Sequence, residues 1–435
     1  MERFALSRMK EWKENENRKP LIIRGARQVG KTWIMKTFGQ QYFEKTAYVN
    51  FDNNARMKQV FEGDLDIERL VLAISAETGV SIEAENTLII FDEIQEVPKA
   101  LTSLKYFYEN APQYAIVAAG SLLGVALHQG TSFPVGKVDV LDLYPLNFSE
   151  FLCAMGEKQF VSMLDSCDTQ MVTVFKTKYI ERLREYYFVG GMPEVVKDFS
   201  EKKDYNRVRV IQKNLINYYQ QDFSKHAEIK LVPRLNLVWN SIPMQLAKEN
   251  KKYIYGQVRE GSRAKDFELA IQWLLDCGLI HKVQRIQKPD LPLKAYIDFD
   301  AFKLFLVDIG LLIAMTDLDA KVIIEGNKIF TEFKGALTEQ YILQQLISDV
   351  GVIPYYYSTQ NSKGEIDFLV QGKTSVIPIE VKAEENLKAK SLKAFCEKYQ
   401  PSYAVRTSMS DYREQYWMTN IPLYAIKWIE NYVNQ

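Results

Sequence analysis

The residues best suited to chemistry lie near the amino end, where positions 25–32 read GARQVGKT after the apolar run Leu21-Ile22-Ile23. This is the Gly-x4-Gly-Lys-Thr pattern of a P-loop, in the strand-then-loop setting that its chemistry requires. The glycines allow the backbone to curve around a phosphate chain, and the helix beginning near Lys31 adds its positive N-terminal end. Lys31 can reach the β- and γ-phosphates, and the Thr32 hydroxyl is a Mg²⁺ ligand. The pattern predicts that a nucleoside triphosphate is bound by Gly25, Ala26, Arg27, Gln28, Val29, Gly30, Lys31 and Thr32.

Two adjacent carboxylates end a later apolar run, LIIFDE at positions 88–93. An acid at the carboxyl end of such a strand lies beside the P-loop, so we expect Asp92 to orient Mg²⁺ and Glu93 to act as the general base. The run Ala115–Ala119 leads to Ser121, which we expect to sense the γ-phosphate. The candidate catalytic residues are therefore Lys31, Asp92, Glu93 and Ser121. The alternatives without catalytic function are that Asp92 and Glu93 form the solvated end of a strand and that Ser121 is an ordinary turn residue.

A second candidate site lies in the tail, in GEIDFLV (364–370) and IPIEVKA (377–383). On two paired strands with alternating faces, Asp367, Glu380 and Lys382 would converge, and Glu339 on the preceding helix would add a third acid. Such a set could hold Mg²⁺ against a phosphodiester, with Lys382 stabilising the attacking hydroxide. The arrangement resembles a restriction-endonuclease-type core with its D…ExK motif. The alternative is a salt-bridged, solvated hairpin face without chemistry.

The elements that would position these residues can be read from periodicity. The first 150 residues alternate apolar runs with amphipathic segments, which predicts a parallel sheet with helices on both faces; the runs are at 21–23, 48–51, 88–91, 115–119 and 138–143. Residues 150–230 look mainly helical, broken at 190–193. A helical stripe at 267–275 followed by a hairpin is typical of a winged-helix module, with Arg259, Arg263 and Lys265 as candidate phosphate contacts.

Composition indicates a soluble, intracellular protein of several domains. The 435 residues include 55 Lys+Arg and 55 Asp+Glu, so the net charge is zero, which argues against a wholly basic nucleic-acid binder but not against a local basic groove. Four scattered cysteines predict a reducing compartment. The amino end lacks a signal-peptide core, and the most apolar stretch, 115–127, is too short to span a bilayer. We therefore expect a cytoplasmic protein with no membrane contact.

The motifs GARQVGKT, LIIFDEIQ, AIVAAGS and LYPLNFSEF, in this order, resemble the AAA-type P-loop ATPases of bacteria and archaea that carry a C-terminal domain of unknown function. The resemblance continues through GGMPE (190–194), YYQQDFSK (218–225) and FKLFLVDIGLL (302–312). It implies an ATPase that uses ATP and Mg²⁺, with a helical linker and a winged-helix-like module. Many relatives have an arginine finger where this chain has Gly136-Lys137, so Arg24, Arg27 and Arg56 stay open as candidates. ATP versus GTP preference also stays open.

The predicted fold class is thus α/β: a parallel-sheet P-loop ATPase core, a helical linker, a winged-helix-like module and a C-terminal restriction-endonuclease-like α/β domain. The expected boundaries are 1–155 (ATPase), 156–230 (linker or lid), 231–325 (winged helix) and 326–435 (nuclease-like). Two functions compete. One is an ATP-driven switch acting on DNA through the C-terminal region; the other is a regulatory ATPase whose C-terminal region is a protein-interaction scaffold. A homo-oligomer or a protein partner is compatible with both.

Overall fold

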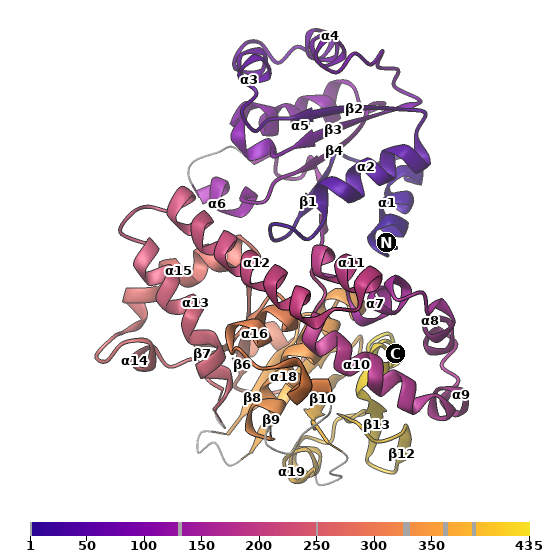
Figure 1. The fold of residues 1–435 in the computed structure, drawn as a ribbon, viewed down its shortest axis with the longest axis vertical. Coiled ribbons are helices and arrows are strands. Elements are labelled where there is room, and N and C mark those ends of the chain that lie inside the picture. The colour runs from indigo at the N-terminus through magenta and orange to yellow at the C-terminus, as the bar shows by residue number, and fades with distance from the viewer. Residues whose placement is uncertain (1, 129–132, 249–250, 325–330, 360–363, 385–388) are drawn as a thin grey trace. The chain divides into compact units, whose positions relative to one another are not determined.

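The computed structural model describes residues 2–128, 133–248, 251–324, 331–359, 364–384 and 389–435 (Figure 1). Their contacts form two compact units. The N-terminal unit comprises Glu2–Tyr144 with Asp276–Leu279, and the C-terminal unit comprises Pro145–Leu275 with Ile280–Gln435. Among the described residues, none of the helices has the length and apolar character needed to cross a membrane.

The N-terminal unit is built on the predicted parallel sheet. Its five strands are ordered β2-β3-β4-β1-β5, and every neighbouring pair is parallel. The inner strands β3 and β4 are buried along their whole length because helices cover both faces. The strands are β1 (Leu21–Arg24), β2 (Lys45–Asn50), β3 (Thr87–Asp92), β4 (Ala115–Ala119) and β5 (Asp139–Asp142). All five predicted apolar runs are confirmed as strands.

Helices on the two sheet faces take alternate strand residues. Ile89 and Phe91 pack in one core with α3, α4 and α5, while Leu88 lies on the opposite face under α2, next to Gly39. The helices of this unit are α1 (Ala5–Glu14), α2 (Lys31–Tyr42), α3 (Ala55–Glu62), α4 (Ile67–Thr78), α5 (Pro98–Asn110) and α6 (Leu123–His128). The carboxyl ends of β1, β3 and β4 therefore meet at one edge, where the P-loop, Asp92 and Ser121 follow.

The C-terminal unit contains a mixed eight-stranded sheet ordered β12-β13-β11-β10-β9-β8-β6-β7. The hairpin β6–β7 is antiparallel, and β6 continues the sheet by pairing in parallel with β8. The strands are β6 (Ile280–Ile286), β7 (Ile297–Leu306), β8 (Tyr355–Ser358), β9 (Glu365–Gln371), β10 (Val376–Val381), β11 (Val405–Ser408), β12 (Arg413–Gln415) and β13 (Met418–Pro422).

The predicted helix-then-hairpin order near 267–306 is confirmed, but the hairpin shares its sheet with the tail strands. A separate winged-helix module and the boundaries at 155, 230 and 325 stay predictions. The helices of this unit are α7 (Phe148–Ala154), α8 (Lys158–Asp165), α9 (Thr169–Val174), α10 (Lys176–Val189), α11 (Pro193–Lys202), α12 (Tyr205–His226), α13 (Val232–Leu246), α14 (Tyr255–Val258), α15 (Ala264–Asp276), α16 (Ile309–Met315), α17 (Ala320–Ile324), α18 (Thr331–Gln345), α19 (Lys390–Tyr399) and α20 (Glu430–Val433).

A buried carboxylate joins distant motifs inside the C-terminal unit. Asp308, fully buried at the start of α16, accepts hydrogen bonds from the backbone N–H groups of Gly191 (2.6 Å) and Leu311 (3.0 Å). Gly190 has φ of +73°, and a Cβ there would lie 2.2 Å from an Asp308 oxygen, so only glycine fits this turn. Burial raises the pKa of Asp308 to about 6, even though its partners all donate to it. The GGMPE and FKLFLVDIGLL motifs thus form one structural contact.

Candidate active site

The P-loop has the backbone shape that its glycines predict. Gly30 caps α2 with φ of +94°, and Gly25 has φ of +151°. A Cβ on Gly25 would lie 2.1 Å from the carbonyl oxygen of Leu143, so a side chain there would collide with backbone. Gln28, between the two glycines, also has a positive φ, of 64°. The loop therefore follows the unusual path that aims backbone N–H groups inward at the amino end of α2.

The ammonium group of Lys31 is folded back onto the loop itself. Nζ donates to the carbonyl oxygens of Gly25 at 2.9 Å and Ala26 at 2.8 Å, and the side chain is only 6% exposed. Burial lowers the pKa of Lys31 to about 8, although the nearby charges of Glu93 and Asp92 raise it. A phosphate oxygen would offer this ammonium a stronger, charged acceptor than the two carbonyls do.

Asp92, at the end of β3, accepts hydrogen bonds from two hydroxyl groups. Its Oδ2 atom accepts from Thr32 Oγ1 at 2.7 Å and from the Tyr48 hydroxyl at 2.9 Å. Thr32 and Asp92 thus present adjacent hard oxygens, the ligand type that Mg²⁺ prefers. Burial, followed by the charge of Asp92, raises the pKa of Tyr48, so its hydroxyl keeps its proton and donates. Sequence analysis missed Tyr48, whose position in β2, opposite Ile90 of β3, was its only signal.

Glu93 and Ser121 are in direct contact where β3 and β4 end. Ser121 Oγ donates to Glu93 Oε2 at 2.9 Å, and Gln95 Nε2 donates to the same oxygen at 2.7 Å. Burial raises the pKa of Glu93, but these hydrogen bonds and the charge of Lys31 lower it more, so the net shift is downward. The carboxylate is therefore ionised at neutral pH, as a general base requires. Gln95 was not predicted, although it belongs to the LIIFDEIQ motif.

The three candidate arginines and Lys137 differ in the residues that they contact. Arg27 Nε donates to Ser121 Oγ at 3.1 Å, inside the site. Arg24 instead pairs with Asp142 at 3.0 Å, and Arg56 pairs with Glu77 at 3.0 Å. Lys137 pairs with Glu109 at 3.0 Å. Of these four cations, Arg27 is the one that contacts a predicted catalytic residue.

The predicted acids of the tail do converge, but with lysines among them. Lys303 of β7, fully buried, pairs with Glu365 and lies 3.5 Å from Glu339 Oε2. Glu339 also pairs with Lys251. Lys303 and Lys251 were not predicted from the sequence, because they lie outside the two strands of the D…ExK motif.

The other tail residues lie beside this cluster. Lys382 Nζ is 2.6 Å from Glu380 Oε1, and Asp367 Oδ2 accepts from the backbone N–H of Val381 at 2.7 Å. The hairpin face is partly solvated: Glu380 is 4% exposed and β10 is buried throughout, whereas Asp367 and Lys382 are half-buried. Burial and the charges of Glu339 and Glu380 raise the pKa of Asp367 well above its usual range. Within the part of the chain that is described, no three His, Cys, Asp or Glu side chains are arranged to hold a metal ion. A metal site here stays a prediction.

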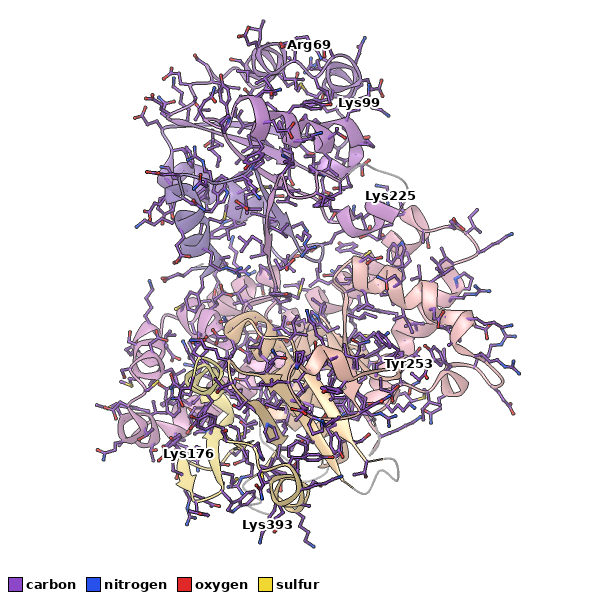
Figure 2. All side chains as sticks on the ribbon, turned by 180° about the vertical axis from the view of Figure 1, so that it is seen from behind. Arg69, Lys99, Lys176, Lys225, Tyr253 and Lys393 are labelled. Atoms are coloured by element: carbon purple, nitrogen blue, oxygen red, sulfur yellow. The ribbon has the colours of Figure 1, made fainter. Side chains whose placement is uncertain are left out.

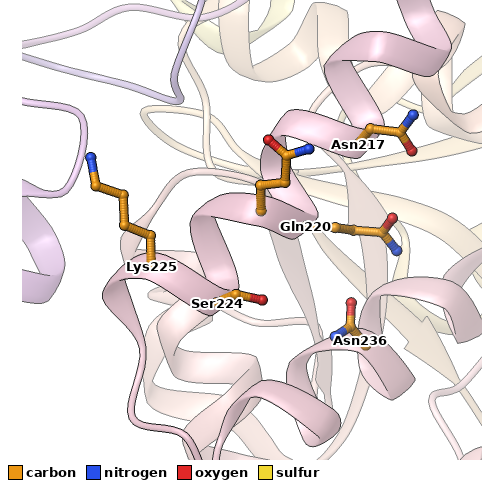
Figure 3. A pocket seen from close by; sticks show the side chains of 6 residues that line it. Asn217, Gln220, Ser224, Lys225 and Asn236 are labelled. Carbon is orange, nitrogen blue, oxygen red and sulfur yellow. The ribbon is translucent and has the colours of Figure 1, made fainter.

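A pocket of about 640 Å³ lies along α12, lined by residues with polar side chains, most of them in the YYQQDFSK motif. Asn217, Gln220 and Ser224 lie on the side of α12 that faces Asn236 of α13, whereas Lys225 points away from it (Figure 3). Lys225 is the one charged residue among the six that line the pocket; the sixth is Gln221.

Three known families match separate parts of the chain. Residues 17–152 match the family described as an AAA domain. Residues 180–322 and 334–426 match two families described as domains of unknown function (DUF8612 and DUF4143). The match at 180–322 spans the predicted boundary at 230. No curated protein matches the chain.

Two solved structures give weaker likenesses. A Walker-type ATPase of Pyrococcus abyssi has a TM-score of 0.44 at 15% identity, covering 72% of this chain and 95% of that one. A RuvB mutant of Thermotoga maritima has a TM-score of 0.28 at 12% identity, covering 64% of this chain and 86% of that one. The AAA-domain match and the P-loop geometry are the basis for the assignment: the chain is an ATPase of the P-loop class, and its N-terminal unit carries the ATPase site.

Proposed function

We propose that the chain is an ATP-driven switch whose C-terminal unit acts on DNA. The switch is supported by hydrogen bonds that the residues of the ATPase site make within the protein. Lys31 donates to loop carbonyl oxygens, Thr32 donates to Asp92, and Ser121 donates to Glu93. Binding of ATP would move Lys31 from the loop carbonyls to phosphate oxygens, while Thr32 stays bonded to Asp92 and Ser121 to Glu93. The two nucleotide states would therefore differ in the contacts that Lys31 makes within the P-loop.

The residues suit hydrolysis of the γ-phosphate. Thr32 and Asp92 would hold Mg²⁺, which when bound offsets the charge of the β- and γ-phosphates. Lys31 would bind the β- and γ-oxygens, and Arg27 would add a second cation from the same loop. Glu93 would take a proton from the attacking water, whose oxygen bonds to the γ-phosphorus while the bond to the ADP oxygen breaks.

Contact with DNA is proposed for residues 259–265, which lead into the first turn of α15. Arg259, Arg263 and Lys265 are exposed, and within the described residues none of their side chains has an ion-pair partner. Unpaired cations this close together can contact successive phosphates. Other exposed cations come from separate elements, such as Lys99 on α5 and Lys393 on α19 (Figure 2).

A binding assay tests this segment. The variant Arg259→Ala/Arg263→Ala/Lys265→Ala should weaken binding to a duplex and lower the salt dependence of log K by about 3, roughly 1 per lost contact. Lys393→Ala is the control, since it removes one exposed charge elsewhere. Equal affinity and equal salt dependence for wild type and the triple variant would reject the assignment.

A regulatory ATPase with a scaffolding C-terminal unit is the second candidate. It is favoured by the tail cluster, in which Lys303 and Lys251 already neutralise Glu339 and Glu365. The amide-lined pocket on α12 also suits a protein partner better than a polyanion, because Lys225 is its one cation.

Nuclease assays separate the two candidates. Plasmid and branched DNA would be incubated with the full chain and Mg²⁺ or Mn²⁺, beside the variant Asp367→Ala. Cleavage that Asp367→Ala abolishes would support chemistry by Glu339, Asp367, Glu380 and Lys382. No binding and no cleavage at modest salt would leave the scaffold as the function of this unit.

A further inference from the structure

The side chain of Gln95 lies between the carboxylate of Glu93 and the backbone of Gly120. Its Nε2 atom donates to Glu93 Oε2 at 2.7 Å. Its Oε1 atom lies 2.1 Å from where a Cβ on Gly120 would be, so any residue other than glycine at position 120 would push the amide away. Gln95 Oε1 itself is buried, with no hydrogen-bond partner within the described residues. The amide therefore satisfies Glu93 while leaving its own acceptor unsatisfied, which is a cost to stability.

The backbone at Glu93 is also unusual. Its φ is +50°, in the left-handed region that few non-glycine residues adopt. This conformation turns the chain from β3 into the short 3₁₀ turn Ile94–Glu96, which places Gln95 back against the Glu93 carboxylate. The local strain and the unsatisfied amide oxygen occur together at one point of the sheet edge.

The hydrogen bonds to Glu93 all end on the same carboxylate oxygen. Gln95 Nε2, Ser121 Oγ and the Ser121 N–H (3.4 Å) donate to Oε2. They come from two different elements, the turn after β3 and the end of β4, so together they fix the plane of the carboxylate. Within the described residues nothing donates to Oε1, which leaves that oxygen for a water molecule.

We propose that Gln95 is a positioning residue, which holds Oε2 of Glu93 so that Oε1 faces the water that attacks the γ-phosphate. The inference rests on the proposed role of Glu93 as general base. In the step that it serves, the water oxygen bonds to the γ-phosphorus, the phosphorus–oxygen bond to ADP breaks with its electrons going to ADP, and the water proton passes to Glu93 Oε1. Gln95 takes no proton and touches no reacting atom.

Steady-state hydrolysis and ATP binding by the full chain test this role. Gln95→Ala removes the donor, and Gln95→Glu keeps the size of the side chain while replacing the donor with an acceptor. Both should lower kcat by about tenfold to a hundredfold, as small misplacements of a catalytic group do. KM and the Kd for ATP should stay within about twofold of wild type, since no phosphate contact is lost. Glu96→Gln is the control, because Glu96 is the exposed neighbour in the same turn and should not change kcat.

A double variant separates this inference from the function on which it rests. In the background Glu93→Gln, adding Gln95→Ala should cause no further loss, because the group that Gln95 positions is already gone. Unchanged kcat in Gln95→Glu, or a full additional loss in the double variant, would overturn the positioning role. If Glu93→Gln alone hydrolyses ATP at the wild-type rate, the base assignment is wrong, whatever the Gln95 variants do. Thermal unfolding of each variant checks that the site still folds.

Discussion

Thr32 Oγ1 and Asp92 Oδ2 lie 2.7 Å apart, although 60 residues separate them in the sequence. The contact exists because β1 and β3 flank β4 in the sheet, so the residues that follow their carboxyl ends meet at one edge. A pair of oxygens at this spacing is ready to share one Mg²⁺ ion. The sheet order thus places the hydroxyl and the carboxylate together.

Replacing the proposed base should separate binding from turnover. Glu93→Gln keeps the size of the side chain and the metal ligand Asp92, so ATP affinity should be unchanged, whereas kcat should fall by about a hundredfold or more because proton removal is lost. Calorimetric binding and phosphate release measure the two quantities. Hydrolysis at the wild-type rate would show that another group activates the water.

Removing the hydroxyl that supports Asp92 should act through the metal. Tyr48→Phe keeps the ring beneath Lys36, which lies 3.7 Å from its centroid, but removes the hydrogen bond to Asp92. The Mg²⁺ concentration for half-maximal activity should rise by about tenfold, the usual cost of losing an outer partner of a metal ligand. Tyr416→Phe, at a fully exposed tyrosine, is the control. An unchanged Mg²⁺ titration would mean that Asp92 needs no such support.

The buried lysine of the tail cluster should be needed for stability. Lys303→Met leaves Glu365 without its buried partner and should lower the free energy of unfolding by about 3–5 kcal/mol. Adding Glu365→Gln removes the uncompensated charge and should recover part of the loss. Denaturant unfolding of the three proteins measures this. A Lys303→Met variant as stable as wild type would indicate that Lys303 is not the counter-charge of the cluster.

Asp308 should make stability depend on pH. Its pKa is about 6 in the folded chain and about 3.8 when unfolded, so the folded state binds its proton more tightly. Stability from this group is therefore complete below about pH 4 and is lost as pH rises through 6, by about 3 kcal/mol in total.

Comparison of wild type with Asp308→Asn at pH 4 and pH 7 isolates this contribution. Burial also raises the pKa of Asp349 to about 6. Its contribution to the pH dependence of stability is therefore present in both wild type and Asp308→Asn. Asp317→Asn is the control: Lys213 lowers the pKa of Asp317, so this substitution cannot remove stability lost between pH 4 and 7. If the two proteins lose equal stability over this range, Asp308 does not titrate there.

Much of the ATPase site was predictable because its chemistry is local in sequence. The glycine spacing of the P-loop dictates its backbone, and apolar runs ending in Asp92 and near Ser121 dictate which strand ends meet. Gln95 and Tyr48 were not predictable in this way. Their roles depend on a left-handed turn at Glu93 and on the pairing of β2 with β3, which no spacing rule specifies.

In the C-terminal unit, less of the site could be predicted, because it depends on contacts between residues far apart in the sequence. The paired strands β9 and β10, which carry Asp367 and Glu380, were predicted from their alternation, and Lys382 follows β10 directly, whereas β8 and β11–β13 were not predicted. The lysines among the acids come from β7 and from the segment before α14, so long-range pairing decides whether the cluster is charged or neutral. The same pairing merges the predicted winged-helix hairpin into the tail sheet.

Calorimetric titration of the intact chain with MgATP tests the central claim most directly. Wild type should bind one nucleotide per chain, and Lys31→Ala should lose that binding while Lys58→Ala, at an exposed lysine of α3, retains it. No measurable binding of MgATP or MgGTP by the folded wild-type chain, or equal binding by Lys31→Ala, would contradict the account.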